Sequence, residues 1–266
     1  MSMKNYEIHI GDSRFAAISF GRGEKDLVII PGLGDGISTV KGKALSGNII
    51  YHQFARRYRV TVISRRDNPA PDCTTCSMAR DQALAMQALG IQKAHIVGVS
   101  QGGMIAQHLA ADHPEMVDKL VLVSTAPDCS DLARENIQRW ISFAKMGSSL
   151  GLMIDTTEKA HPEKYLKKLR PLYPYLSNQA KKADVARFSI LAQACLSHDA
   201  LEKLDRIKSP TLIIGGGADR ILGVDGSHII HRFIEGSTLK IYEDQGHALY
   251  EDQPDYEKTV LAFLKD

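Results

Sequence analysis

The chain has 266 residues, of which 44% are hydrophobic and 24% are charged, and its formal net charge is +2. This composition is that of an ordinary globular protein, which excludes the disordered and membrane-embedded classes, and so small a charge excludes a nucleic-acid footprint. The length suits one large domain, or one domain with a modest insertion. No apolar run reaches the length of a membrane span or a signal peptide, so we expect a cytoplasmic protein without membrane insertion.

Eight short apolar segments predict β-strands. The first two form a hairpin or a pair of short strands, because alternating apolar residues in Tyr6–Ile10 are followed by a turn at Gly11 and a second run at Phe15–Phe20. The other six are short apolar runs, and most of them lack polar alternation, as is typical of strands buried on both faces: Leu27–Ile30, Val60–Ile63, His95–Val99, Leu120–Val123, Thr211–Ile214 and Leu239–Tyr242. Helical stretches such as Ala79–Leu89 and Met104–Asp112 lie between several of them. Strands that alternate with helices pair in parallel, so we predict an α/β fold with a doubly wound, mostly parallel sheet of about eight strands.

The alternation of strands and helices stops between residues 128 and 208. This segment has helical periodicity and no strand pattern. Its apolar positions at i, i+3, i+4 and i+7 include Ile137, Trp140, Ile141 and Ala144. Pro171 and Pro174 divide the segment into several helices. We therefore predict a core made of residues 1–127 and 209–266, which carries a helical cap of residues 128–208.

The part of this segment from Lys159 to Arg187 is locally basic. We interpret it as a solvated helical face, with attraction of acidic substrates as the alternative. Under either interpretation the net charge of the chain is too small to indicate a nucleic-acid partner.

Four cysteines are too few and too scattered for the disulfide framework of a small secreted domain. Two of them, in Cys73-Thr-Thr-Cys76 ahead of a predicted helix, have a spacing that is also found in redox pairs and in halves of zinc sites. No second pair of cysteines or histidines at ligand spacing completes a metal site. We interpret Cys73 and Cys76 as ordinary loop residues and expect neither a metal nor a redox role.

The segment Gly98-Val99-Ser100-Gln101-Gly102 matches the pattern G-x-S-x-G. In that pattern a strand ends in a sharp turn that leads into a helix, the serine lies at the apex, and the glycines let strand and helix pack closely. Ser100 has this context, because a buried strand precedes it and a helical stretch follows it. A second match, around Ser149, follows a helical run and leads into no buried strand, so we predict a loop there.

A serine hydroxyl is a weak nucleophile unless a histidine removes its proton and a carboxylate orients that histidine. Among ten histidines we select His247, because it lies in the loop after the last strand, and such loops gather at one edge of a parallel sheet. Asp219 is the leading carboxylate, since a buried strand and a glycine turn precede it. The alternatives are Asp128, one strand earlier, and Asp225, further along the same loop.

The glycine-rich run Pro31–Gly36 directly follows a buried strand and can turn its backbone N–H groups toward an oxyanion. It also resembles the start of a dinucleotide fingerprint, but Ile37 stands where the third glycine belongs. The sequence also lacks a phosphate-binding loop that ends in Gly-Lys-Ser or Gly-Lys-Thr. We therefore expect no nucleotide cofactor.

Together these segments resemble the α/β-hydrolase superfamily over nearly the whole chain. The order Ser100, Asp219, His247 matches the order of nucleophile, acid and histidine in that family. The resemblance implies that the N–H groups of Leu33 and Gln101 form the oxyanion hole. It also implies that the helical insertion covers the active site.

The chain departs from the family pattern in two places. The segment Ser64–Asp72 replaces the usual Asp-x-x-Gly-x-Gly-x-Ser after the third strand of the sheet, and Pro31 stands where many relatives carry a histidine. These differences bear on the substrate more than on the catalytic groups.

We expect a serine hydrolase that cleaves a carboxylic ester, thioester, lactone or amide of a small molecule through an acyl-enzyme, without a metal or organic cofactor. Within the superfamily, a serine nucleophile argues against dehalogenases and epoxide hydrolases, which use aspartate. The alternatives that keep the serine are a C–C bond hydrolase, a perhydrolase and an iminopeptidase. A rival hypothesis from another class is a protein that binds a small ligand without turnover. Binding alone needs none of Ser100, Asp219 and His247, so the presence of all three argues against it.

Overall fold

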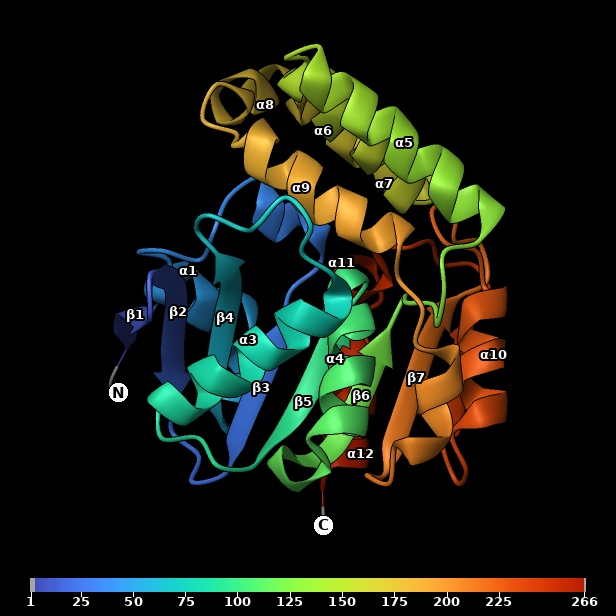
Figure 1. Ribbon diagram of the computed structural model, residues 1–266. Helices are drawn as coiled ribbons and strands as arrows, with labels where there is room; N and C mark the ends of the chain where they lie inside the picture. Colours follow the sequence, from blue (N-terminus) through green and yellow to red (C-terminus); the bar gives the residue numbers. More distant parts are fainter. Residues whose placement is uncertain (1–2, 266) are drawn as a thin grey trace.

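The computed structural model describes residues 3–265, and its centre is one eight-stranded sheet (Figure 1). The strands lie in the order β1-β2-β4-β3-β5-β6-β7-β8. Their bounds are β1 Lys4–Ile10, β2 Ser13–Gly21, β3 Asp26–Ile30, β4 Arg59–Arg66, β5 Ala94–Val99, β6 Val117–Val123, β7 Thr211–Gly216 and β8 Thr238–Tyr242. β2 runs antiparallel to β1 and β4, and all other neighbours are parallel. The predicted doubly wound, mostly parallel sheet is confirmed, with a strand at each of the eight predicted positions. The expectation of burial on both faces is wrong for β8, because it lies at the edge of the sheet and its residues are exposed or half-buried.

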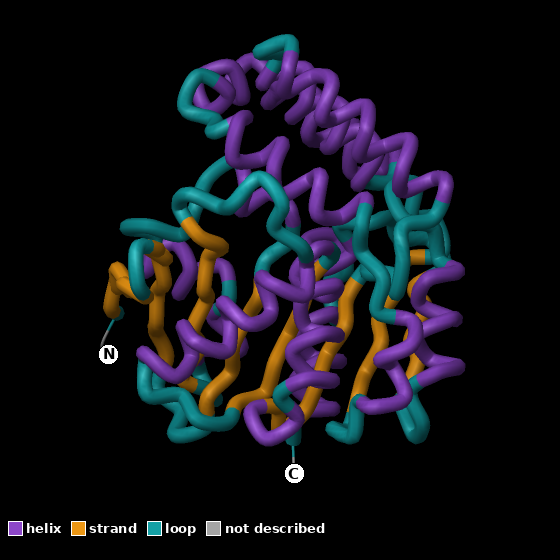
Figure 2. The backbone as a smooth tube through the Cα atoms, viewed as in Figure 1, coloured by secondary structure: helices purple, strands orange, loops and turns teal. Residues whose placement is uncertain are grey.

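Helices cover both faces of the sheet (Figures 1 and 2). One face carries α3 Thr75–Ala88, α4 Gln101–Asp112 and α10 Asp225–Phe233, and the other carries α1 Ala44–Ile50, α2 His52–Ala55 and α12 Tyr256–Leu264. Because successive side chains of a strand point to opposite faces, each inner strand contributes to two cores. In β3, Val28 and Ile30 pack on the side of α3 and α4, whereas Leu27 and Ile29 pack on the side of α2 and α12. With both faces closed, the carboxyl edge of the sheet is the place left for a site.

Five helices between β6 and β7 lie over the carboxyl ends of the parallel strands (Figure 1), and we call them the helical layer. They are α5 Asp131–Lys145, α6 Ser149–Ala160, α7 Glu163–Leu169, α8 Tyr173–Ala180 and α9 Val185–Leu196. The four apolar residues of α5 at helical spacing are buried in one cluster with residues of α9. The prediction of a loop at Ser149 is wrong, because this residue begins α6. Gly147, with a φ of 67°, ends the turn after α5 and lets the chain enter the next helix at once.

The basic stretch in the helical layer is exposed at most of its cationic residues, which are Lys164, Lys167, Lys168, Arg170, Lys181 and Lys182. Arg187 at its end is buried instead. The interpretation as a solvated face is therefore wrong for Arg187, whose guanidinium finds carbonyl and carboxylate acceptors inside the protein.

The remaining elements within residues 3–265 are short. They are α11 Leu249–Asp252 and the 3-10 turns η1 Leu33–Gly36, η2 Pro114–Met116, η3 Arg170–Leu172 and η4 Leu201–Arg206. Across the same residues, no helix combines the length and the apolar character that a membrane crossing requires.

Candidate active site

Ser100 lies in a tight turn between β5 and α4. Its backbone has φ 53° and ψ −119°, a conformation that residues with a side chain rarely adopt and that costs about 1–3 kcal/mol. Hydrogen bonds hold this strained turn: the Ser100 N–H donates to Val123 O (2.9 Å), and Thr125 Oγ1 donates to Ser100 O (2.9 Å). The serine is therefore kept at the end of the strand, where the helix begins.

Close packing requires the glycines on either side of Ser100. A Cβ at Gly98 would lie 2.5 Å from Gly102 O, and a Cβ at Gly102 would lie 1.9 Å from Ile30 O. Both distances are far below van der Waals contact, so no larger residue fits without a backbone shift. In the second G-x-S-x-G match, by contrast, a Cβ at Gly147 would meet no atom within 4 Å. Around Ser100, close packing therefore explains both glycines of the pattern. Around Ser149, it does not explain the first glycine, Gly147.

His247 and Asp219 are hydrogen-bonded to each other beyond the ends of β8 and β7. The Nδ1 atom of His247 lies 2.7 Å from Oδ2 of Asp219, and both side chains are buried. The other carboxylate oxygen, Oδ1, accepts the backbone N–H groups of Ile221 (2.7 Å) and Leu222 (3.0 Å). Because both oxygens are occupied, the carboxylate is fixed and takes the Nδ1 proton of a neutral ring, which leaves Nε2 as a proton acceptor.

The loops after β7 and β8 are held against each other by their backbones. The N–H of Ala218 donates to the carbonyl of Gln245 (2.9 Å). Only glycine fits at the contact, since a Cβ at Gly216 would lie 2.4 Å from Gly246 O. The glycine turn that precedes Asp219 in the sequence therefore allows the approach of the loop that carries His247.

One cavity of about 860 Å³ joins four of the residues selected from the sequence, and Asp219 is connected to it through its bond to His247. Ser100 and His247 line it, together with Leu33 and Gln101. His247 is bonded through Nδ1, and within residues 3–265 no hydrogen bond joins the ring to the Ser100 hydroxyl. Contacts of this kind tighten when a substrate binds. Apolar side chains form most of the remaining wall, including Met104, Ile137, Trp140, Ile221, Leu222 and Tyr256.

Leu33 and Gln101, whose backbone N–H groups are the predicted oxyanion donors, both line the cavity with Ser100. Leu33 begins η1 and Gln101 begins α4, so neither N–H has an acceptor within its own helix. Across the described residues, neither group donates to another protein atom. Gly32 brings the first of them near the serine, because a Cβ at Gly32 would lie 4.0 Å from Ser100 Oγ. Both amides can therefore bind an oxyanion that forms at Ser100.

The alternative carboxylates lie elsewhere. Asp128 forms an isolated backbone bridge with Asp199, and Asp225 is the first residue of α10. Within residues 3–265, neither one is hydrogen-bonded to His247. Of the three candidate carboxylates, Asp219 is the one that the structure brings to His247.

The sequence does not predict a second histidine–carboxylate pair that the structure contains. Nδ1 of His161, at the end of α6, lies 2.8 Å from Oδ2 of Asp252 in α11. Beside this pair, the N–H of Ala248 donates to the carbonyl of Ala160 (3.0 Å). These bonds join the helical layer to the loop that carries His247. No sequence pattern points to the pair, because 91 residues separate its members and His161 follows no strand.

The four cysteines are free thiols, and burial raises the pKa of the Cys73 thiol above its ordinary value. Cys76 lies with His108 and Asp112, whose potential ligand atoms are all within 4.8 Å of one another and of the Cys76 sulfur. Lys203 Nζ lies at the same cluster, 2.6 Å from Asp112 Oδ2 and 3.8 Å from Cys76 Sγ. The ammonium group therefore pairs with the carboxylate of this cluster.

The chain is similar to known hydrolases in sequence and in fold. A family model described as alpha/beta hydrolase fold matches residues 6–254. The putative carbamate hydrolase RutD of Caulobacter sp. (strain K31) is 29% identical over 207 residues, which cover 72% of this chain and 72% of the relative. A 2-hydroxy-6-oxononadienedioate/2-hydroxy-6-oxononatrienedioate hydrolase of Klebsiella pneumoniae subsp. pneumoniae is 26% identical, over 98% of this chain and 92% of its own.

Among solved structures, the fold is similar to that of MGS-M2, an alpha/beta hydrolase enzyme from a Medee basin deep-sea metagenome library. The TM-score is 0.84 at 20% identity, over 97% of this chain and 96% of the other. This likeness concerns the fold, whereas the family model rests on the sequence and spans nearly the whole chain. The protein therefore belongs to the alpha/beta hydrolase fold family.

Proposed function

We propose that this protein is a serine hydrolase that cleaves a carboxylic ester, thioester, lactone or amide of a small molecule through an acyl-enzyme. One observation carries the proposal: His247 Nδ1 lies 2.7 Å from Asp219 Oδ2, in a histidine that lines the same cavity as Ser100. A carboxylate that fixes one ring nitrogen leaves the other to take the serine proton. Membership in a family whose relatives are named as hydrolases supports the same class of reaction.

In the proposed reaction, Ser100 Oγ attacks the carbonyl carbon of the substrate while Nε2 of His247 takes the hydroxyl proton. Negative charge develops on the carbonyl oxygen, and the N–H groups of Leu33 and Gln101 stabilise it. When the tetrahedral intermediate collapses, the leaving group receives the proton from His247 and the acyl group stays on the serine. Water then attacks the acyl-enzyme in the same way, which releases the acid and restores the free hydroxyl.

The cavity favours a substrate with an apolar acyl or leaving group, which the helical layer would cover as a cap. Its volume of about 860 Å³ suits a small molecule, and most of its wall is apolar. Hydrolysis of a C–C bond beside a ketone is the second candidate, because the same groups can attack a ketone carbonyl. The Klebsiella relative, which is named for an oxo-dienedioate substrate and aligns along 98% of this chain, favours this candidate.

Turnover of a chromogenic short-chain ester and labelling by a fluorophosphonate test the proposal. We expect the wild type to hydrolyse the ester and to carry the label on Ser100, as peptide mass spectrometry reports. The Ser100→Ala variant should lose both properties. Ser149→Ala is the matched control, because it changes the serine of the second G-x-S-x-G match, and it should keep both.

Two results would contradict the proposal. Equal labelling of the wild type and Ser100→Ala would remove Ser100 from the role of nucleophile. A wild type that takes no label and turns over none of the esters, thioesters, lactones, amides and dienones in a screen would favour a binding protein.

A further inference from the structure

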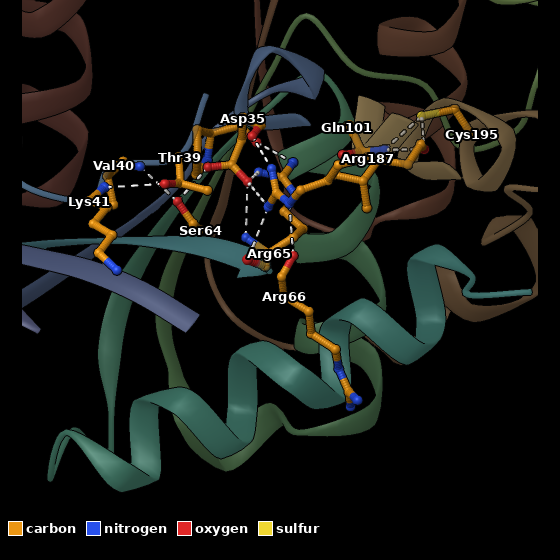
Figure 3. Close-up of polar contacts among 12 residues, drawn as sticks. Asp35, Thr39, Val40, Lys41, Ser64, Arg65, Arg66, Gln101, Arg187 and Cys195 are labelled. Carbon is orange, nitrogen blue, oxygen red and sulfur yellow. Dashed lines mark hydrogen bonds and ion pairs between the residues drawn. The ribbon is translucent and has the colours of Figure 1, made fainter. Parts of the chain in front are cut away.

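Two buried arginines hold the loop of residues 31–36, which carries the Leu33 N–H (Figure 3). Arg65, near the end of β4, donates from Nη2 to the carbonyl of Pro31, two residues before Leu33. Arg187, in the first turn of α9, donates from Nη1 to the carbonyl of Asp35, two residues after Leu33. Neither arginine lines the cavity. Carbonyl groups on both sides of Leu33 are therefore fixed from outside the cavity.

The Asp35 carboxylate ties these contacts together. Its Oδ2 atom accepts Arg187 Nη2–H (2.9 Å) and the backbone N–H of Arg65 (3.0 Å), and its Oδ1 atom accepts the Ser64 hydroxyl (2.5 Å). The Asp35 side chain is 1% exposed and that of Arg187 is 4% exposed, so water does not compete for these bonds. A buried, fully bonded charge pair resists displacement, because moving one partner leaves the other unpaired.

The Arg187 guanidinium also connects the loop to the end of β4. Besides its bonds to Asp35, it donates from Nη2 to Arg65 O (3.0 Å) and from Nε to Arg66 O (2.8 Å). A planar group with donors in a fixed fork can make these contacts at once, whereas a lysine ammonium cannot. The position of the loop relative to the sheet therefore depends on this one side chain of the helical layer.

The same helix contacts the residue that supplies the other oxyanion donor. Gln101 Nε2 donates to Leu191 O (2.7 Å) and lies 3.0 Å from Cys195 Sγ. Figure 3 shows Gln101 beside Cys195. Arg187, Leu191 and Cys195 are spaced by four residues and lie on one face of α9. This face can come close because the loop has glycine at position 36, where a Cβ would lie 2.9 Å from Phe188 Cα.

We propose that Arg187 is a positioning residue and that α9 aligns the oxyanion hole, with Arg187 and Arg65 fixing the Leu33 N–H from behind. The inference rests on the proposed function, since it names how that site is held. An N–H contributes most when it already points to the place where charge develops. The network also holds two guanidinium groups against one carboxylate, and the net positive charge behind the loop favours the oxyanion.

Arg187→Gln and Arg187→Lys test the alignment. We expect kcat for a p-nitrophenyl ester to fall roughly 10–100-fold in Arg187→Gln, with KM within about threefold, because ground-state binding uses the cavity wall and not the hole. Arg187→Lys keeps the charge and loses the fork, so its kcat should fall less. The affinity for a trifluoromethyl ketone, which forms a tetrahedral adduct with the serine, should fall in parallel with kcat. The affinity for the matching methyl ketone should not change.

Arg66→Gln is the matched control. Arg66 follows Arg65 in β4, and its backbone carbonyl, which accepts the Arg187 Nε–H, is kept in this variant. Its side chain extends away from the loop (Figure 3) and pairs with Asp81 through Nε (2.7 Å). We expect this variant to lose thermal stability and to keep the wild-type kcat and ketone affinity. The control thus separates the loss of a partly exposed ion pair from the loss of alignment.

A folded Arg187→Lys or Arg187→Gln protein with wild-type kcat and ketone affinity would overturn the proposal. An effect confined to KM would overturn it too, as would an equal loss of kcat in Arg66→Gln. The proposed function fails separately: a wild type that hydrolyses no substrate and takes no label on Ser100 overturns that function, and this proposal with it. An active wild type with unchanged variants overturns the alignment alone.

Discussion

Two histidine–carboxylate pairs in this molecule have nearly the same geometry in different surroundings. The Nδ1–Oδ2 distance is 2.7 Å between His247 and Asp219 and 2.8 Å between His161 and Asp252. His247 lines the cavity with Ser100, whereas His161 lies outside the cavity lining, where the helical layer meets α11. A carboxylate can orient an imidazole for proton transfer or join two layers of a protein. The surroundings of the second ring nitrogen, and not the distance, distinguish the two roles.

The largest expected difference between the pairs concerns the histidines. His247→Ala should lower kcat on the order of 10⁶-fold, or about 8 kcal/mol, because Ser100 loses its proton acceptor. His161→Ala is the matched change and should leave kcat within about tenfold. Ester hydrolysis by the two purified variants measures both effects. Near-normal turnover in His247→Ala would assign the base to another histidine.

The carboxylates should differ in the same direction by a smaller factor. Asp219→Asn should lower kcat on the order of 10⁴-fold, since an amide no longer holds His247 in the tautomer that accepts a proton at Nε2. Asp252→Asn should change kcat little. Circular dichroism and thermal melting establish that each variant is folded before rates are compared. A loss of this size in Asp128→Asn instead would move the acid one strand back along the chain.

His108 and His198 show what burial does to an imidazole that, within residues 3–265, is not hydrogen-bonded to a carboxylate, although Asp112 lies near His108. The rings of His108 and His198 meet edge to face with centroids 5.3 Å apart, and His198 Nδ1 lies 2.8 Å from Thr75 Oγ1. Burial lowers the pKa of His108 to about 4 and that of His198 to about 3. Below the unfolded-state pKa of about 6.5, the unfolded chain binds protons that the folded chain does not. The stability that the neutral rings of His108 and His198 contribute is therefore complete above pH 6.5. It is lost as the pH falls from 6.5 toward their folded-state pKa values.

The expected loss from His108 alone is about 3 kcal/mol between pH 6.5 and pH 4. Urea unfolding at a series of pH values measures it as a falling free energy of unfolding. His108→Gln cannot titrate and should flatten this dependence even if it lowers stability at pH 7. The same slope in the variant and the wild type would show that His108 is not the group responsible.

Local patterns in the sequence predicted the sheet and the residues at the ends of its strands. Ser100 and Asp219 each follow a buried strand, and His247 follows the strand at the edge of the sheet; a short run rich in apolar residues marks each strand in the sequence. The steric demands at Gly98 and Gly102 come from the chain around one turn and one neighbouring strand. The five-residue pattern G-x-S-x-G therefore identifies Ser100. Asp219 and His247 were predicted from their positions in loops that follow strands of the sheet.

Contacts between buried charged residues, by contrast, have no local pattern in the sequence that would predict them. The partners are 91 residues apart in His161–Asp252 and 152 residues apart in Asp35–Arg187. Arg187 ends a basic stretch, where a charged side chain is normally exposed, so composition argued for the wrong environment. Which charged residues become buried is decided by the packing of α9 on η1, a contact between segments that no period or spacing connects.

The smallest predicted effect tests whether the second pair only joins the two layers. Both side chains are nearly buried, with 10% exposed in His161 and 8% in Asp252. A double-mutant cycle of His161→Ala and Asp252→Ala should give a coupling free energy of about 1–2 kcal/mol in thermal or urea unfolding. The pH profile of kcat should keep its shape in both single variants, because neither residue holds a proton that the reaction moves. A shifted profile in His161→Ala would mean that the pair acts on His247 through the loop they share, and the contrast between the two pairs would then be one of degree.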